Sequence, residues 1–187
     1  MSTTTLPYRI GDSDAACRYP VIIGADLVIG RAWRWHRDWL VVTSEGERNL
    51  RRPPVGTKGL DMAAAHLAGE YAAGRITAVP LASDPAETAR PHGPAPLLDL
   101  RMPVTARNIA GARTALARLA EHRWWPLGGF PGSDNPWFMQ CQLCEWQGPR
   151  YWSHLRGRNG NPPSAGRHPG GCIGESEVRA LVPAYQR

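Results

Sequence analysis

Three cysteines and two histidines gather in the last third of the chain, and their types and spacing predict metal chemistry. Cys141 and Cys144 are separated by two residues, the spacing at which one tight turn directs both sulfurs at a single Zn²⁺. His154, His168 and Cys172 follow. Because a cysteine pair supplies only two of the four ligands of a tetrahedral site, the other two must come from these three residues.

Two ligand sets remain open for the rest of the tetrahedron. His168 and Cys172 enclose Pro169-Gly170-Gly171, whose glycines allow a close chain reversal around a metal. In a finger-like alternative, His154 replaces one of these two. A third possibility is a group of surface thiols without any metal. We expect a Zn²⁺ held by four residues: Cys141, Cys144, His168 and Cys172.

The number of protein ligands decides what such a metal can do. Four protein ligands leave no position for water, so the ion stabilises the fold and performs no Lewis-acid chemistry. Hydrolysis requires a three-ligand site, with Glu175 or His154 as general base beside the bound water. The sequence contains neither a phosphate-cradling glycine loop nor a nucleophile elbow. We therefore predict no catalytic residues. The fourth cysteine, Cys17, is predicted to be an ordinary small buried residue.

The charge of the chain is concentrated in its second half. The formal net charge is +6, with 11 basic and 11 acidic residues in 1–100 and 11 basic and 5 acidic residues in 101–187. A basic half favours an anionic partner, most often nucleic acid. The alternative is a merely solvated basic surface, since only one of the 22 basic residues is lysine, a bias that a GC-rich genome imposes without functional cause.

Residues 150–161 interleave arginines with aromatic and small polar residues, which suits nucleic acid. Arg150, Arg156 and Arg158 are the predicted phosphate contacts. The alternative is that Trp146, Tyr151, Trp152 and Leu155 form the small core of a zinc module, and we expect at least two of these aromatic residues to be core. DNA is the expected partner rather than RNA. A protein-interaction adaptor with a structural zinc is the alternative, and a metal-dependent nuclease is a third possibility.

The elements before this region predict a small α+β unit. From residue 19 to about residue 52, short β-branched and aromatic runs alternate with turn signals, which is typical of a small antiparallel sheet, here of three strands. Four apolar residues then recur at helical spacing: Leu60, Ala64, Leu67 and Tyr71. Thr57 is the expected cap and Gly74 the expected end. This order resembles, over residues 20–74, the sheet-plus-helix unit of double-stranded-RNA-binding and integrase-arm domains.

A proline-rich stretch separates the two halves. Residues 79–103 contain six prolines, which remove backbone donors, so we predict a semi-rigid linker between a domain of residues 1–78 and one of residues 104–187. A second helix is predicted to begin after Thr105 as N-cap and to continue to about His122.

The cysteine region also carries a resemblance. The motifs, in chain order, are Trp124-Trp125-Pro126-Leu127, Pro131-Gly132-Ser133, Pro136-Trp137, the Cys141/Cys144 pair and Gly170-Gly171-Cys172. Over about residues 123–175 they resemble a treble-clef zinc module of uncharacterised actinobacterial and phage proteins. That pattern ends in Gly-Gly-Cys-x-x-Cys, whereas this chain has Glu175 at the last position. The resemblance implies a zinc module attached to nucleic-acid-processing, regulatory or defence-related proteins and identifies no reaction.

Membrane insertion and export are not expected. No apolar run approaches the roughly 20 residues that span a bilayer, and the N-terminus lacks the basic start and apolar stretch of a secretory signal. We therefore expect a cytoplasmic protein. The predicted fold class is α+β: a small three-stranded antiparallel sheet with one helix, then a helix and a treble-clef-like zinc module. The predicted function is zinc-stabilised nucleic-acid binding without catalysis.

Overall fold

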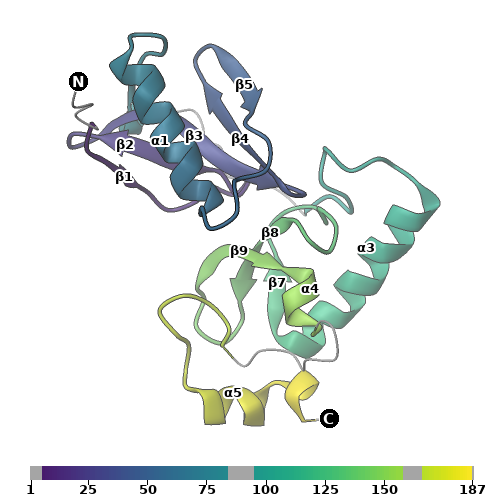
Figure 1. The fold of residues 1–187 in the computed structure, drawn as a ribbon. Coiled ribbons are helices and arrows are strands. Elements are labelled where there is room, and N and C mark those ends of the chain that lie inside the picture. The colour runs from purple at the N-terminus through teal and green to yellow at the C-terminus, as the bar shows by residue number, and fades with distance from the viewer. Residues whose placement is uncertain (1–5, 84–94, 158–165, 187) are drawn as a thin grey trace. The chain divides into compact units, whose positions relative to one another are not determined.

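The chain folds into two compact units of mixed α+β structure (Figure 1). The computed structural model describes three stretches of the chain: residues 6–83, 95–157 and 166–186. We call Met1–Arg90 the N-terminal unit and Pro91–Arg187 the C-terminal unit. The fold class agrees with the prediction from the sequence, and the division falls inside residues 79–103. Within the described stretches, no helix combines the length and apolar surface needed to cross a bilayer.

The N-terminal unit is built on one antiparallel sheet. Its strands are β1 (Tyr8–Ile10), β2 (Tyr19–Ile23), β3 (Leu27–Trp35), β4 (Asp38–Thr43), β5 (Gly46–Asn49) and β6 (Val79–Pro80). They pair in the order β1-β2-β3-β4-β5, and β6 pairs with the start of β3. The sheet is larger than the three strands expected, because the polar strand β5 and the proline-ending β6 lack the alternation that reveals a half-buried strand.

The helix α1 (Gly59–Ala72) lies across one face of this sheet, as Figure 1 shows. Its buried side chains are Ala63, Ala64, Leu67 and Ala68. They pack against β-branched residues of the sheet to form the core of the unit. Gly30 of β3 has φ +151°, and a Cβ there would lie 2.8 Å from the Leu67 side chain. Glycine at this position therefore permits the close approach of α1 to the sheet.

The ends of α1 agree with the prediction only at the C-terminus. Gly74 has φ +69° and donates its N–H to the carbonyl of Tyr71, so it ends the helix as expected. The N-cap is Lys58 rather than Thr57, and Lys58 makes no side-chain cap. Thr57 instead donates its N–H to the carbonyl of Pro54, so a turn occupies the position predicted for the cap.

The C-terminal unit combines short helices with a second sheet. Its elements are α3 (Ala106–Leu119), β7 (Trp124–Pro126), β8 (Pro136–Cys141), β9 (Gln147–Tyr151), α4 (Trp152–Leu155) and α5 (Glu175–Leu181). The strands pair antiparallel in the order β7-β8-β9. Thr105 caps α3 as predicted, because its Oγ1 accepts from the N–H of Asn108 at 3.2 Å.

One buried cluster joins α3 to this sheet. It contains Ala112, Ala115, Leu119, Trp124, Phe130, Trp137, Met139, Cys141, Trp152 and Leu155. Of the aromatic residues expected to be core, Trp152 belongs to this cluster, Trp146 is partly buried and packs against it, and Tyr151 is not part of it. In the N-terminal unit, Cys17 is 5% exposed, which confirms its predicted burial.

The described ends of the proline-rich stretch each join a unit. Val79 and Pro80 form β6 on the first sheet. Leu97 and Leu98 pack against the buried cluster of the C-terminal unit, and Leu98 bridges to Phe130. Residues 84–94, the middle of the predicted linker, lie outside the described residues.

Candidate metal centre

The structure brings together the four ligands predicted from the sequence. One ligand atom from each of Cys141, Cys144, His168 and Cys172 lies within 4.8 Å of all the others. Cys141 ends β8, and Cys144 lies in the turn that leads to β9. His168 and Cys172 lie in the segment that precedes α5. Two separate pieces of chain therefore each supply two ligands.

A tight turn aims the first pair of sulfurs. The N–H of Glu145 donates to the carbonyl of Cys141 at 2.9 Å, and the N–H of Cys141 donates to the carbonyl of Trp146 at 2.8 Å. Glu145 has φ +60°, a left-handed conformation that reverses the chain within this turn. The strand pairing of β8 and β9 therefore holds the Cys-x-x-Cys segment in a hairpin turn.

The two sulfur–sulfur distances are close to those that a tetrahedral zinc ion sets. Zn–S bonds of about 2.3 Å at tetrahedral angles place two sulfurs about 3.8 Å apart. The Cys141 and Cys172 sulfurs are 3.8 Å apart, and the Cys172 and Cys144 sulfurs are 3.5 Å apart. The Cys144 sulfur lies 3.0 Å from Nε2 of His168. A set of three sulfurs and one imidazole nitrogen is also the donor chemistry that zinc prefers in structural sites.

The surroundings of His168 orient its ring toward the sulfurs. Its Nδ1 lies 3.0 Å from the carbonyl oxygen of Pro169, and because a carbonyl only accepts, this contact fits a proton on Nδ1. Nε2 then carries the lone pair that a metal needs. The Trp146 ring stacks on the imidazole at 4.6 Å with 4° between the planes, and Trp124 meets both rings edge-on.

Arg167 is a component of the centre that the sequence analysis missed. Its side chain is 1% exposed, and its Nε donates to the Cys141 sulfur at 3.2 Å. Its other two nitrogens donate to the carbonyls of His122 and Arg123 at 2.8 and 2.7 Å. The guanidinium also lies 4.5 Å from the centre of a Trp124 ring. Zn²⁺ with three thiolates has a net charge of −1, which this buried cation compensates.

The thiols of the centre titrate differently because their surroundings differ. Burial alone raises the pKa of Cys141, but the backbone N–H groups of Leu143 and Cys144 and the guanidinium of Arg167 bring it below its ordinary value. Burial and the neighbouring cysteines Cys144 and Cys141 raise the pKa of Cys172 to about 11. A metal binding all the sulfurs must therefore displace protons, most strongly from Cys172.

The other candidates for metal chemistry lie outside this group. His154 is exposed on α4, and its ring lies 5.0 Å from that of Tyr151. Glu175 accepts from Arg179 at 2.7 Å at the start of α5. The group thus offers four protein ligand atoms, which would leave no position for water on a four-coordinate ion.

The three predicted phosphate-binding arginines have different environments. Arg150 is half-buried, and its Nη2 donates to the carbonyl of Gly166 at 3.5 Å. Burial lowers its pKa. Arg156 is exposed at the end of α4. Arg158 lies outside the described residues. Of these arginines, Arg156 is the one that the structure places on the surface.

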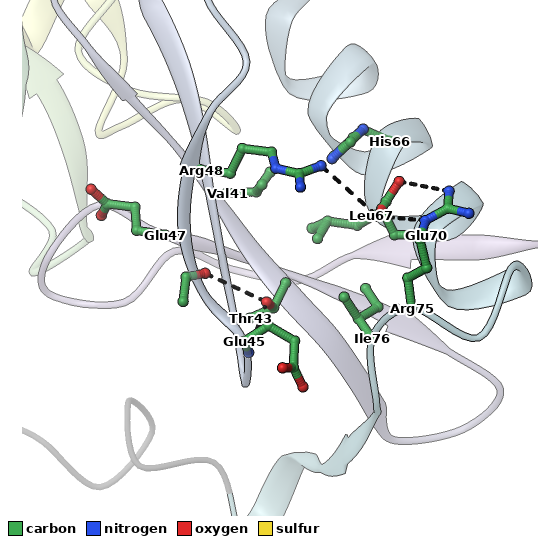
Figure 2. A pocket seen from close by; sticks show the side chains of 11 residues that line it. Val41, Thr43, Glu45, Glu47, Arg48, His66, Leu67, Glu70, Arg75 and Ile76 are labelled. Carbon is green, nitrogen blue, oxygen red and sulfur yellow. Dashed lines mark hydrogen bonds and ion pairs between the residues drawn. The ribbon is translucent and has the colours of Figure 1, made fainter.

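A pocket of about 440 Å³ lies between the β4–β5 hairpin and α1 (Figure 2). Glu70 accepts from Arg75 at 2.8 Å and lies 3.9 Å from Arg48. The hydrogen bond from Arg75 lowers the pKa of Glu70 to about 2. Burial lowers the pKa of His66. Because Glu70 already pairs with both arginines, this pocket does not offer the surplus cation that an anionic ligand needs.

Comparison with known proteins adds no family to these observations. No family model matches the chain, and neither a curated protein nor a solved structure matches it. The functional argument therefore depends on the geometry of the centre and on the surfaces around it.

Proposed function

We propose that the C-terminal unit is a zinc-stabilised module that binds nucleic acid and has no catalytic chemistry of its own. The observation that supports the zinc part is the closed group of three sulfurs and one imidazole nitrogen. Four protein ligands suit a structural ion. One ligand pair in a hairpin turn and the other just before a helix also suit the treble-clef arrangement, which we include in the proposal together with a cytoplasmic location.

The exposed surface of α3 supports the proposal that this unit binds nucleic acid. Arg107, Arg113 and Arg118 are exposed, and α3 contains no acidic residue. Arg107 and Arg118 are eleven residues apart, which places them within about 20° of each other around the helix, whereas Arg113 lies about 120° to 140° from them on another part of the exposed surface. A merely solvated helix usually carries both signs of charge. A helix surface with cations alone matches the phosphates of a nucleic acid instead.

The opposite stripe of α3 explains why these arginines remain outside. Ala112, Ala115 and Leu119 are buried against the sheet, so the helix has one apolar stripe with the arginines outside it on both sides. Arg123 follows the helix and is also exposed. We add Arg156 to this surface and retain DNA as the favoured partner.

A salt-titrated binding assay tests the proposal. Replacing Arg107, Arg113 and Arg118 together by glutamine should weaken binding to DNA and reduce the slope of log K against log salt by about two to three units. A matched control removes the same charge from exposed residues of the N-terminal unit: Arg37→Gln, Arg52→Gln and Lys58→Gln. Equal losses in the two triple variants would show that only net charge matters. Wild-type affinity in the α3 variant, with zinc retained, would exclude this face.

A further inference from the structure

The outer face of the β7-β8-β9 sheet presents three aromatic side chains. Successive residues of a strand point to opposite faces. β8 buries Trp137, Met139 and Cys141, so Phe138 points away from the core. The register pairs Trp125 with Gln140, Phe138 with Pro149, and Pro136 with Tyr151. These pairs place Trp125, Phe138 and Tyr151 on the same outer face, one on each strand.

These rings are not part of the core. Trp125 is 59% exposed, and Phe138 and Tyr151 are partly exposed. None of the three belongs to the buried cluster or to the partly buried residues packed against it. A tryptophan that is more than half exposed on a strand points to a surface that meets another molecule.

The three rings follow a diagonal across the sheet. Phe138 is two residues from Gln140, the partner of Trp125, and Tyr151 is two residues from Pro149, the partner of Phe138. Diagonal neighbours on one face are about 7–8 Å apart, roughly twice the ~3.4 Å rise between stacked bases. Each ring can therefore take one base of a strand whose bases are spread apart.

The charge around this face selects the kind of partner. The remaining outer residues of the three strands are two prolines and two glutamines, so the face itself carries no charge. Exposed Arg123 directly precedes β7, and exposed Arg156 closes α4, which begins immediately after Tyr151. An uncharged aromatic centre with cations beyond both edge strands complements bases inside a chain of phosphates. The two glutamine amides interrupt the apolar surface that a protein partner requires, and they can donate to and accept from base edges.

We infer that this face binds unpaired bases of single-stranded nucleic acid, by stacking on Trp125, Phe138 and Tyr151. The inference deepens the proposed nucleic-acid binding and depends on it. In this inference the arginines bind the phosphates, and the aromatic face of the sheet binds the bases. Duplexes keep their bases stacked inside, so they can use only the phosphate contacts.

Four probes of about 12 nucleotides test the inference, a length within the range of site sizes for such surfaces. They are oligothymidine, oligouridine, a DNA duplex, and an abasic strand with the same phosphates. Fluorescence anisotropy should show tighter binding of both single strands than of the duplex or the abasic strand. Trp125→Leu and Tyr151→Leu should each weaken binding of the single strands by roughly 5- to 100-fold and leave the duplex unchanged. Trp125→Phe should restore most of the affinity.

The control variant is Leu181→Ala, which removes a 53% exposed apolar residue from α5 and should have no effect. Zinc content and circular dichroism confirm that each variant is folded. Equal, salt-dependent affinity for all four probes, unchanged in Trp125→Leu, overturns base stacking and leaves the proposed phosphate binding intact. Absence of binding to every probe overturns both. Self-association of the wild type that Trp125→Leu abolishes, without a change in affinity for the strands, identifies the face as a protein interface and overturns the inference.

Discussion

The two units of the chain bury their cores by different means. In the N-terminal unit, α1 packs small apolar residues against a six-stranded sheet to form a core of Val, Ile, Ala and Leu, and buried Arg31 lies 3.6 Å from the Asp14 carboxylate. In the C-terminal unit, the sheet has strands of only 3, 6 and 5 residues, and the buried set includes Cys141 and the charged Arg167. A guanidinium in a core is stabilising only when it is paired. Buried Arg167 donates to the Cys141 sulfur within the group that could hold a metal, so we expect the second unit to depend on a metal and the first on apolar burial.

Removal of zinc should produce the largest difference in stability between the two units. Cys144 is exposed, so Cys144→Ser changes little apart from the metal. We expect about one zinc per chain in the wild type, little in the variant, and an unfolded C-terminal unit, because structural zinc contributes about 10–16 kcal/mol of apparent binding free energy. Elemental analysis and hydrogen exchange, read separately for each unit, measure these changes.

The matched control for this experiment is His154→Ala. His154 lies outside the four-ligand group, so the variant should retain its zinc and its hydrogen-exchange protection. Loss of zinc from His154→Ala would assign that residue to the metal. A Cys144→Ser protein without zinc whose C-terminal unit remains protected would remove the contrast between the units.

The second prediction concerns the buried cation. Arg167→Leu leaves two carbonyls and the Cys141 thiolate without their donor, so we expect a loss of about 3–5 kcal/mol from the C-terminal unit. Zinc affinity should fall about 10- to 100-fold. Chelator competition measures the affinity. Exposed Arg156→Leu is the control, and an equal effect in both variants would mean that Arg167 has no special role.

The ligand set could be predicted from the sequence, but its surroundings could not. A Cys-x-x-Cys pair in a short turn is typical of a metal site, and the Pro-Gly-Gly segment brings His168 and Cys172 together locally. Arg167 is one of 22 basic residues, and nothing near it in sequence distinguishes it. Its partners lie 26 to 45 residues earlier, so only the folded chain reveals the contact.

The same distinction between local and distant signals applies to the fold. The Thr105 cap and the apolar spacing of α1 are local, and both predictions hold. The edge strands β1, β5 and β6 are short, and their pairing depends on neighbours elsewhere in the chain. Local propensity therefore predicts α1, α3 and the centre of the first sheet but underestimates the width of that sheet, and α5 and the β7-β8-β9 sheet were not predicted.

The third prediction perturbs the apolar core alone. Leu67 is fully buried between α1 and the sheet. Leu67→Ala should destabilise the N-terminal unit by about 2–5 kcal/mol through lost burial and the cavity that remains. Denaturant unfolding followed by hydrogen exchange should show the change in this unit, with zinc content unchanged. A simultaneous loss of zinc would indicate that the two units fold together rather than independently.

The smallest expected effect is a pH dependence confined to the C-terminal unit. His122 is 1% exposed, and neither ring nitrogen has a hydrogen-bond partner among the described residues. Its ring meets Trp152 and Tyr185 edge-on. Burial, together with the cations Arg118 and Arg167 and against the opposing carboxylate of Glu121, lowers the pKa of His122 to about 4.

Because the unfolded chain binds this proton more readily than the folded chain, the C-terminal unit has its full stability above the ordinary histidine pKa. It loses stability as the pH falls toward 4. Between about pH 7 and about pH 5 the loss amounts to roughly 2 kcal/mol. His122→Phe removes the titrating group and retains a planar ring, so at saturating zinc the variant should lose about 2 kcal/mol less than the wild type over this range. Zinc release is common to both proteins and cancels in that difference. Parallel curves of unfolding free energy against pH would mean that His122 is as easily protonated in the folded chain as in the unfolded one.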